Sequence, residues 1–435
     1  MAGTIKALHF RPSFSISPTS SSFFTSSLHF KTLFPKSHFQ TSTISFNSIK
    51  NPSIIHLPPR LTVSHIRASS SSNSIDDGGN GNPEAKNSGN LLQLVKPILD
   101  FTANNFLPLA LVGGVVLGLA NPGLGCLADQ YSLSKVSTFC IFIISGLTLR
   151  SQEIGAAKDA WPVGLFGLVS ILLLTPVFSR LILLLNFQPP EFVTGLAIFT
   201  CMPTSLSSGV SLTQLAKGNF ALALAMTVIS NLLGILVVPF TVSKFVGAGV
   251  GISIPTEQLF KSLVITLLIP LILGKVLREA VDGVGKFADN NSKLLSIISA
   301  VFLSLVPWIQ VSKSRSLLMM VNPTGFLLAI GLGAVLHIVL LVFNALAIKT
   351  LSLFSGGKRS IFSNRQNAVA FLLVASQKTL PVTVAVVDQL GGAMGASGLL
   401  VLPCVAAHLN QIILDSFLVN FLLKRDQTAH LPKAA

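Results

Sequence analysis

The sequence predicts an all-α membrane protein, because charges are few, apolar segments are long, and these segments repeat in two halves. Charged residues make up 10% of the 435 residues and hydrophobic residues 50%, whereas a soluble domain carries about 25% charged residues. The net charge is +15, but the basic residues lie in the N-terminal segment and singly between apolar runs. Such a distribution excludes a soluble multidomain enzyme and predicts no nucleic-acid partner.

Ten apolar segments are expected to cross the membrane as helices, each of which needs about 20 mainly apolar residues. Three windows, 219–243, 325–348 and 389–414, contain no charged residue. Pro, Gly and charges set the boundaries of the rest. The expected spans are 104–121, 132–149, 162–184, 191–215, 219–243, 258–279, 293–312, 324–350, 366–388 and 396–423.

These spans divide into two halves, about 104–243 and about 258–423. The starts of the first four pairs of equivalent spans differ by 154, 161, 162 and 175 residues. Because each half has an odd number of spans, the second must enter the membrane in the opposite orientation. Two inverted five-helix repeats are typical of secondary transporters, although random helix lengths are an alternative explanation of the spacing.

Residues 1–68 are predicted to be a chloroplast transit peptide. Residues 1–75 contain seven Lys or Arg, many Ser and Thr, and no acidic residue, as organellar transit peptides do. Ile66-Arg67-Ala68-Ser69 resembles a chloroplast processing site; a disordered cytosolic tail is the alternative. We expect a disordered linker at 69–95, the transporter domain at 96–425 and a C-terminal tail at 426–435.

The loops predict the orientation. Basic residues gather after spans two, four, six and eight and at the C-terminus, whereas the other side holds mainly Lys244, Lys313 and Arg315. Positive residues favour the side that is not translocated. We therefore expect the protein in the plastid inner envelope, with both mature termini in the stroma.

Span four is polar at its centre. Pro203 removes a helical hydrogen bond, and four hydroxyl residues follow it: Thr204, Ser205, Ser207 and Ser208. Unwound backbone at this depth is tolerated where it lines a wet cavity, so these hydroxyls are candidate binding groups. A kinked helix whose hydroxyls bond to its own carbonyls is the alternative.

Span nine, the equivalent of span four, is interrupted in the same way by Ser376-Gln377-Lys378-Thr379-Leu380-Pro381. Two interrupted helices in equivalent places indicate a transporter binding site. A charge such as Lys378 at the centre of a span costs at least about 2.5–3.5 kcal/mol, so we expect it to have a partner or a function. Snorkelling or structural pairing is the alternative.

A few polar residues also lie in the other spans. Thr227 shares a face of span five with Ala223. In span ten, His408 and Asp415 are seven residues apart and thus on one side of the helix. His337 is interpreted as packed or hydrogen-bonded rather than functional. The four cysteines lie far apart and support neither a disulfide framework nor a zinc site.

In these residues the chain resembles the bile acid:sodium symporter family, specifically its plastid sodium/metabolite cotransporter branch, over about residues 100–425. The landmarks are Ser145-Gly146-Leu147-Thr148-Leu149, Cys201-Met202-Pro203 with the hydroxyl run, Gly218-Asn219-Phe220-Ala221-Leu222, and Pro403 with His408. The resemblance implies ten helices, in a panel part (spans one, two, six and seven) and a core part whose fourth and ninth helices cross unwound.

The resemblance also implies sodium ligands at Ser208, Thr227 and Gln377, with backbone carbonyls from Val374 and Ser376. Four family positions differ: the span-nine glutamate is Leu373, the asparagine after the glutamine is Lys378, the span-four asparagine is Gly209, and the span-five serine is Ala223. Repulsion of about 4 kcal/mol at about 4 Å from Lys378 would weaken sodium binding by about three decades. Alternatively, its ammonium occupies the place of a bound cation, attracts an anionic substrate, or loads and releases a proton.

The leading interpretation is a secondary transporter, a sodium- or proton-coupled symporter of a small organic anion across the plastid inner envelope. Its partners are this anion, a coupling cation and the lipid bilayer; no cofactor is expected besides sodium as the coupling ion. The candidate binding residues are Thr204, Ser205, Ser207, Ser208, Thr227, Val374, Ser376, Gln377, Lys378 and Thr379. A non-transporting regulator of ion homeostasis is the alternative. An enzyme is not expected, because the sequence contains no HExxH, GxSxG or Gly-rich phosphate loop.

Overall fold

The structure is a computed structural model that describes residues 106–150, 155, 157–390 and 392–429. Within these residues every regular element is helical, which confirms the predicted all-α class. The expected transit peptide, the linker and residues 430–435 of the tail lie outside the described residues. Residues 426–429 of the expected tail continue the last helix.

Seven helices of the described chain are long and apolar enough to cross a membrane, and eight if the bent pair α2 (Phe106–Ala120) and α3 (Pro122–Gln130) is one span. The seven are Lys158–Leu183, Phe220–Val250, Thr256–Ala280, Ser292–Lys313, Pro323–Phe354, Arg365–Leu390 and Ser397–Gln427. The expected number of ten is thus not reached by length and composition. Two expected spans fall short: α4 (Leu133–Thr148) has 16 residues, and the fourth span is divided into two short helices.

Three of these spans contain wide helical turns. The first of them consists of η2 (Lys158–Ala160), α6 (Trp161–Val169), η3 (Ser170–Leu174), η4 (Thr175–Val177) and α7 (Phe178–Leu183). The second consists of α10 (Phe220–Thr241), η5 (Val242–Gly247) and α11 (Ala248–Val250). The third consists of α12 (Thr256–Leu263), η6 (Val264–Leu268) and α13 (Ile269–Ala280). Proline lacks the N–H that continues an α-helix, and π turns precede Pro176 and Pro270. Such turns leave carbonyl oxygens free for other partners.

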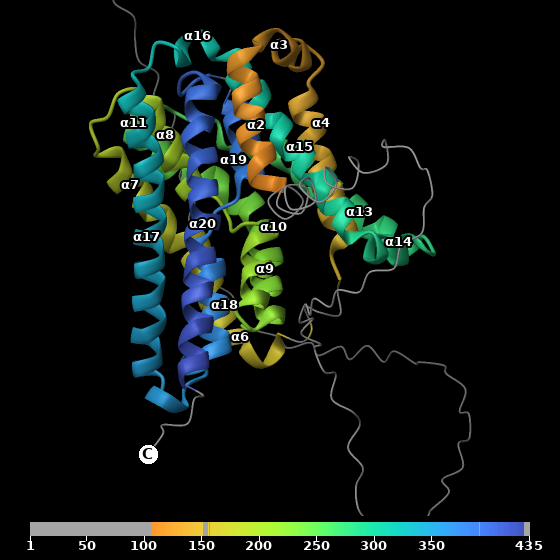
Figure 1. Ribbon diagram of the computed structural model, residues 1–435, viewed down its shortest axis with the longest axis vertical. Coiled ribbons are helices and arrows are strands. Elements are labelled where there is room, and N and C mark those ends of the chain that lie inside the picture. The colour runs from red at the N-terminus through yellow and green to blue at the C-terminus, as the bar shows by residue number, and fades with distance from the viewer. Residues whose placement is uncertain (1–105, 151–154, 156, 391, 430–435) are drawn as a thin grey trace, which may run out of the picture. The chain divides into compact units, whose positions relative to one another are not determined.

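One group of helices packs around α15 (Ser292–Lys313), which contacts α2, α3 and α4, while α4 also contacts α13 and α14 (Val284–Asn290). Figure 1 shows these helices together on one side. The α4–α13 contact requires two glycines. A Cβ at Gly146 would lie 2.2 Å from the carbonyl oxygen of Leu271, and a Cβ at Gly274 would lie 2.2 Å from that of Ile143. Side chains at either position would separate the two helices.

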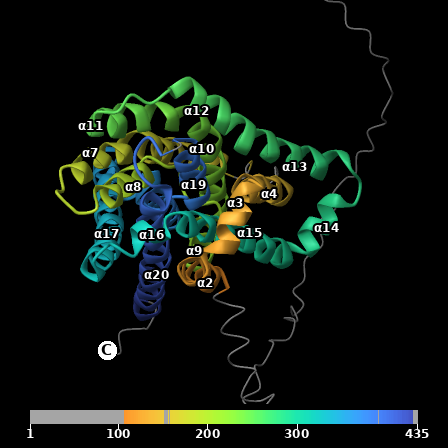
Figure 2. The same ribbon diagram turned by 90° about the horizontal axis from the view of Figure 1, so that it is seen from above.

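A second group contains the two interrupted helices. The long helices α17 (Pro323–Phe354) and α20 (Ser397–Ala429) lie side by side, and α8 (Pro190–Thr200) packs on α20. α18 (Arg365–Ser376) contacts α17, α10 and α9 (Ser208–Leu215). Figure 2 shows the same grouping from above, with the short α16 (Arg315–Leu318) beside α20.

Both interruptions predicted from the sequence are present. α8 ends at Thr200 and α9 begins at Ser208, because Pro203 cannot continue the helical ladder. α18 ends at Ser376, and α19 (Leu380–Leu390) begins after three intervening residues. Residues 201–207 and 377–379, here called the first and second breaks, therefore carry backbone groups without helical partners.

Candidate functional site

The two breaks are hydrogen-bonded to each other. The N–H of Thr379 donates to the carbonyl oxygen of Pro203 at 3.0 Å, and the hydroxyl of Thr204 donates to the carbonyl oxygen of Val374. From α10, the Nδ2 of Asn231 donates to the carbonyl oxygen of Thr204 at 3.0 Å. The breaks thus bond to each other through Thr379 and Pro203, and α18 and α10 bond Thr204, so these groups find partners inside the protein rather than in lipid.

Lys378, in the second break, is 1% exposed. Its Nζ donates to three oxygens: the Ile171 carbonyl at 3.1 Å, the Thr175 hydroxyl at 2.6 Å and the Met202 carbonyl at 3.0 Å. Ile171 belongs to the π turn η3, which explains why its carbonyl oxygen is accessible. The ammonium is therefore not snorkelling, and it joins the second break to the first and to a third helix.

The α20 helix completes the backbone bonding of the second break. The Oε1 of Gln411 accepts from the N–H of Lys378 at 3.0 Å, and its Nε2 donates to the carbonyl oxygen of Lys378 at 2.7 Å. The same Nε2 lies 2.8 Å from the Nδ1 of His408. The side-chain amide of Gln411 thus bonds both backbone groups of Lys378, which has no helical partners in the break.

A continuous line of polar side chains leads from the first break into the core. Ser205 Oγ lies 2.6 Å from Ser208 Oγ, and Ser208 Oγ donates to Gln377 Oε1 at 2.6 Å. Gln377 Nε2 donates to Asp415 Oδ2 at 2.6 Å, and Asp415 Oδ1 lies 2.8 Å from His337 Nε2. His337 is thus hydrogen-bonded, as expected, and its partner is Asp415 of α20.

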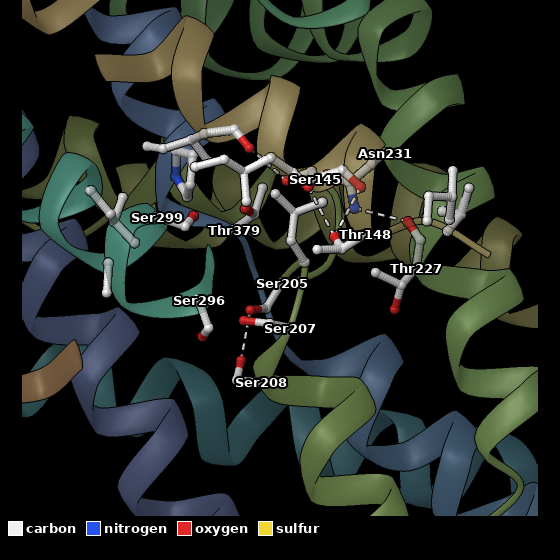
Figure 3. Close-up of a pocket in the computed structure, with 18 of the residues that line it drawn as sticks. Ser145, Thr148, Ser205, Ser207, Ser208, Thr227, Asn231, Ser296, Ser299 and Thr379 are labelled. Carbon is white, nitrogen blue, oxygen red and sulfur yellow. Dashed lines mark hydrogen bonds between the residues drawn. The ribbon is translucent and has the colours of Figure 1, made fainter. Parts of the chain in front are cut away.

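A cavity of about 240 Å³ lies between the breaks and the helices α4, α10 and α15. Figure 3 shows its polar lining. These polar residues are Ser145, Thr148, Ser205, Ser207, Ser208, Thr227, Asn231, Ser292, Ser296, Ser299, Thr379 and His408. No Asp, Glu, Lys or Arg is among the described residues that line it. The cavity therefore offers hydroxyl and amide groups but no fixed charge of its own.

The structure places half of the predicted site residues at this cavity. Five line it: Ser205, Ser207, Ser208, Thr227 and Thr379. Five others are not among the residues that line it: Thr204, Val374, Ser376, Gln377 and Lys378. Ser376 is occupied in the core, where its hydroxyl donates to the carbonyl oxygen of Leu340 and accepts from Asn344. The ammonium of Lys378 donates to Ile171, Thr175 and Met202, none of which lines the cavity.

The sequence analysis missed the part of the lining that comes from α4 and α15. Ser145 and Thr148 appeared in it only as family landmarks, and Ser296 and Ser299 did not appear. Ser292, Ser296 and Ser299 recur at a spacing that puts them on one helix face, and this spacing was a usable signal.

The oxygens at the cavity fit a hard cation such as sodium, which prefers oxygen ligands. Ser208, which lines the cavity, donates to Gln377 Oε1 directly beside the lining. Thr227 also lines the cavity, and its buried Oγ1 has no hydrogen-bond partner in the described structure. Because a buried unpaired hydroxyl is unfavourable, this oxygen is available to a ligand. The described residues contain no group of three or more His, Cys, Asp or Glu that would hold a transition metal.

The comparisons with known proteins agree on one family. The model of the SBF-like CPA transporter family matches residues 104–424. A protein of Arabidopsis thaliana named "Probable sodium/metabolite cotransporter BASS4, chloroplastic" is 64% identical over 353 residues, which cover 81% of this chain and 80% of that protein. The protein of the same name from Oryza sativa subsp. indica is 61% identical over 76% of this chain and 78% of its own length. "Sodium/bile acid cotransporter 7-A" of Xenopus laevis is 26% identical over 71% of this chain and 89% of its own.

Proposed function

Because this chain belongs to the SBF-like CPA transporter family, we propose that it is a sodium-coupled symporter of a small organic anion in the plastid inner envelope. The family resemblance seen in the sequence is confirmed, and the chain is a transporter and not an enzyme. The names of its plant relatives, which include sodium, a metabolite and the chloroplast, support the coupling ion and a chloroplast membrane. The inner envelope is part of this proposal, and the distribution of basic loops supports stromal termini.

The proposed architecture is ten spans in two inverted repeats. The packing supports it, because α2 packs on α15 and α4 packs on α13. These contacts pair span one with span seven, and span two with span six. In the proposed repeat, span one is equivalent to span six and span two to span seven. Exchanging the two repeats therefore converts one pair into the other. The two hydrogen-bonded breaks lie in spans four and nine, which the repeat also exchanges.

The observation that carries the proposal is a cavity with many hydroxyl groups and no charged side chain in its described lining. A small anion that enters it loses hydration and meets hydrogen-bond donors, but no countercharge. A sodium ion bound beside it at Ser208, Gln377 and Thr227 supplies that countercharge. Each ion then favours the binding of the other, which is the condition for symport.

Lys378 has a different place in this mechanism. Its ammonium is held by three oxygens of η3, η4 and the first break, so it acts as a resident cation that fixes the crossing. Transport then proceeds by movement of the core helices against α2, α4, α13 and α15, since the cavity lies between these two groups. The breaks, bonded to each other, move together.

Uptake by proteoliposomes that contain the full chain tests the proposal. The probes are radiolabelled small carboxylates and sulfonates, offered under an inward gradient of sodium, potassium or protons. We expect accumulation of at least one anion under the sodium gradient only, and its reduction in Ser208→Ala. Ser304→Ala is the matched control, because the hydroxyl of Ser304 donates to its own helix at 2.8 Å outside the cavity. Equal uptake under potassium and sodium would contradict the proposal.

A further inference from the structure

We infer that Asp415 is a positioning residue for the coupling cation: it orients the amide of Gln377 and supplies the negative charge of the sodium site. This inference rests on the proposed sodium coupling. Asp415 belongs to α20, not to either interrupted helix, and its side chain is fully buried, at 0% exposure. A buried carboxylate is costly unless it is hydrogen-bonded and has a function.

The hydrogen bonds of Asp415 fix the direction of the Gln377 amide. A carboxylate only accepts hydrogen bonds, so the amide atom that faces Asp415 Oδ2 at 2.6 Å must be the donor Nε2. The opposite atom, Oε1, then faces Ser208, whose hydroxyl lies 2.6 Å away and lines the cavity. Asp415 thus presents a carbonyl oxygen, rather than an NH₂ group, on the side where a cation would bind.

His337 holds the other oxygen of the carboxylate. Its Nε2 lies 2.8 Å from Asp415 Oδ1, and both side chains are buried between α17 and α20. This contact fixes the plane of the carboxylate, so that Oδ2 remains directed at Gln377. The arrangement is a chain of three side chains, from α17, α20 and the second break, and it ends at the candidate ligand.

The charge of Asp415 is also available to the site. Lys378 is the nearest basic residue along the second break, but its three acceptors belong to η3, η4 and the first break, and none belongs to α20. The cavity's described lining holds no acidic residue, and Leu373 of α18 is a buried hydrocarbon. Asp415, one amide group away from Ser208, is therefore the carboxylate that the polar line brings to the cavity.

Equilibrium binding of ²²Na⁺ to the purified full chain in nanodiscs tests the inference without a known substrate. Asp415→Asn keeps the shape of the side chain but removes its charge and allows the Gln377 amide to turn. We expect its half-saturating sodium concentration to rise at least about tenfold. Asp388→Asn is the matched control, because Asp388 also accepts from a glutamine amide, that of Gln310 at 2.9 Å, but lies outside the cavity lining. It should change sodium binding by less than about twofold.

A double-mutant cycle separates positioning from general damage. If Asp415 acts through Gln377, the effects of Asp415→Asn and Gln377→Leu on sodium binding are strongly non-additive. Asp415→Glu keeps the charge, and we expect it to bind sodium more tightly than Asp415→Asn. It is the variant to measure if Asp415→Asn does not fold, and its affinity should then stay within about tenfold of the wild type.

The outcomes distinguish the two proposals. Saturable binding by the wild type that is unchanged in Asp415→Asn, or additive effects in the cycle, would overturn the inference and leave sodium coupling intact. Loss of binding in Asp415→Glu would overturn it as well. Absence of saturable ²²Na⁺ binding in the wild type would instead refute the proposed sodium coupling itself.

Discussion

The ammonium of Lys378 in the second break donates to the carbonyl oxygen of Met202 in the first break at 3.0 Å. These two residues are distant in sequence, and their contact joins the two interrupted helices at the point where both lack helical bonds. The same ammonium reaches η3 and η4 through Ile171 and Thr175. A single buried charge therefore holds three segments in a fixed arrangement.

We expect Lys378→Met to lower the free energy of unfolding by about 3 kcal/mol, because three acceptors lose a charged donor. Thermal unfolding in detergent measures this loss. Lys349→Met, at an exposed position of α17, is the control and should unfold as the wild type does. An equal stability of both variants would contradict the structural role of Lys378.

Lys378→Met also tests whether the ammonium of Lys378 repels the coupling sodium ion or only holds the crossing in place. Because none of the three acceptors of the ammonium lines the cavity, ²²Na⁺ binding by the folded fraction should change by less than about threefold. A gain of about three decades in sodium affinity would show that Lys378 repels the coupling ion, as the sequence alone suggested.

Thr227 should affect binding but not stability. Thr227 lines the cavity, and its buried Oγ1 has no hydrogen-bond partner in the described structure, so Thr227→Val removes an unpaired hydroxyl at nearly constant volume. We expect the melting temperature to stay equal or rise, and the half-saturating ²²Na⁺ concentration to rise about tenfold. Thr227→Ser, which keeps the oxygen, is the control. A Thr227→Val variant with normal sodium binding would remove this residue from the site.

The contact between α4 and α13 predicts a large effect of one methyl group. A Cβ at Gly274 would lie 2.2 Å from the carbonyl oxygen of Ile143, so Gly274→Ala should destabilise the protein by about 1–3 kcal/mol through overpacking. Gly331→Ala in α17 is the control, because its Cβ would meet no atom within 4 Å. Thermal unfolding of both variants checks the prediction, and similar melting temperatures for the two would contradict the described packing.

Much of the fold was predictable because its signals are local. Pro203 and the polar run at Gln377 predicted two interrupted helices, and these are present at the predicted residues. Hydropathy predicted helices in the right places, but α4 and the divided fourth span are too short to count by length. Apolar length shows where a helix lies, but it does not show how far the helix extends.

The candidate site was only partly predictable because its contacts are not local. The polarity of Thr227 and Ser208 could be read from the sequence. The acceptors of Lys378 lie about two hundred residues away, at Ile171 and Met202, and no periodicity pairs them. The Asp415–His337 contact likewise joins two helices whose polar residues look isolated in sequence.

Asp289 of α14, outside the expected spans, gives a pH-dependent prediction. Partial burial acts to raise the pKa of Asp289, but the hydrogen bonds and charges of Arg278 and Arg150 outweigh it and lower this pKa below its usual value. A lowered folded-state pKa stabilises the protein above the unfolded value of about 4 and loses this effect as the pH falls through the folded value. Asp289→Asn should therefore have a lower melting temperature than the wild type near neutral pH, and the difference should vanish in acid. A difference that does not depend on pH would contradict this origin.

Thiol labelling tests most directly that the cavity between the two helix groups is a hydrated pathway. Ser299→Cys places a thiol in the lining from α15. Val301→Cys on the same helix lies outside the lining, and its 41% exposed position on a candidate membrane span is expected to face lipid, where a reagent confined to water does not reach it. Both variants are made in a chain whose four native cysteines are replaced by alanine. The account predicts that a membrane-impermeant maleimide labels Ser299→Cys from one side of the membrane only, and that sodium together with a transported anion slows this labelling, while Val301→Cys remains unlabelled. Absence of labelling of Ser299→Cys from both sides, or labelling equal to that of Val301→Cys, would contradict it.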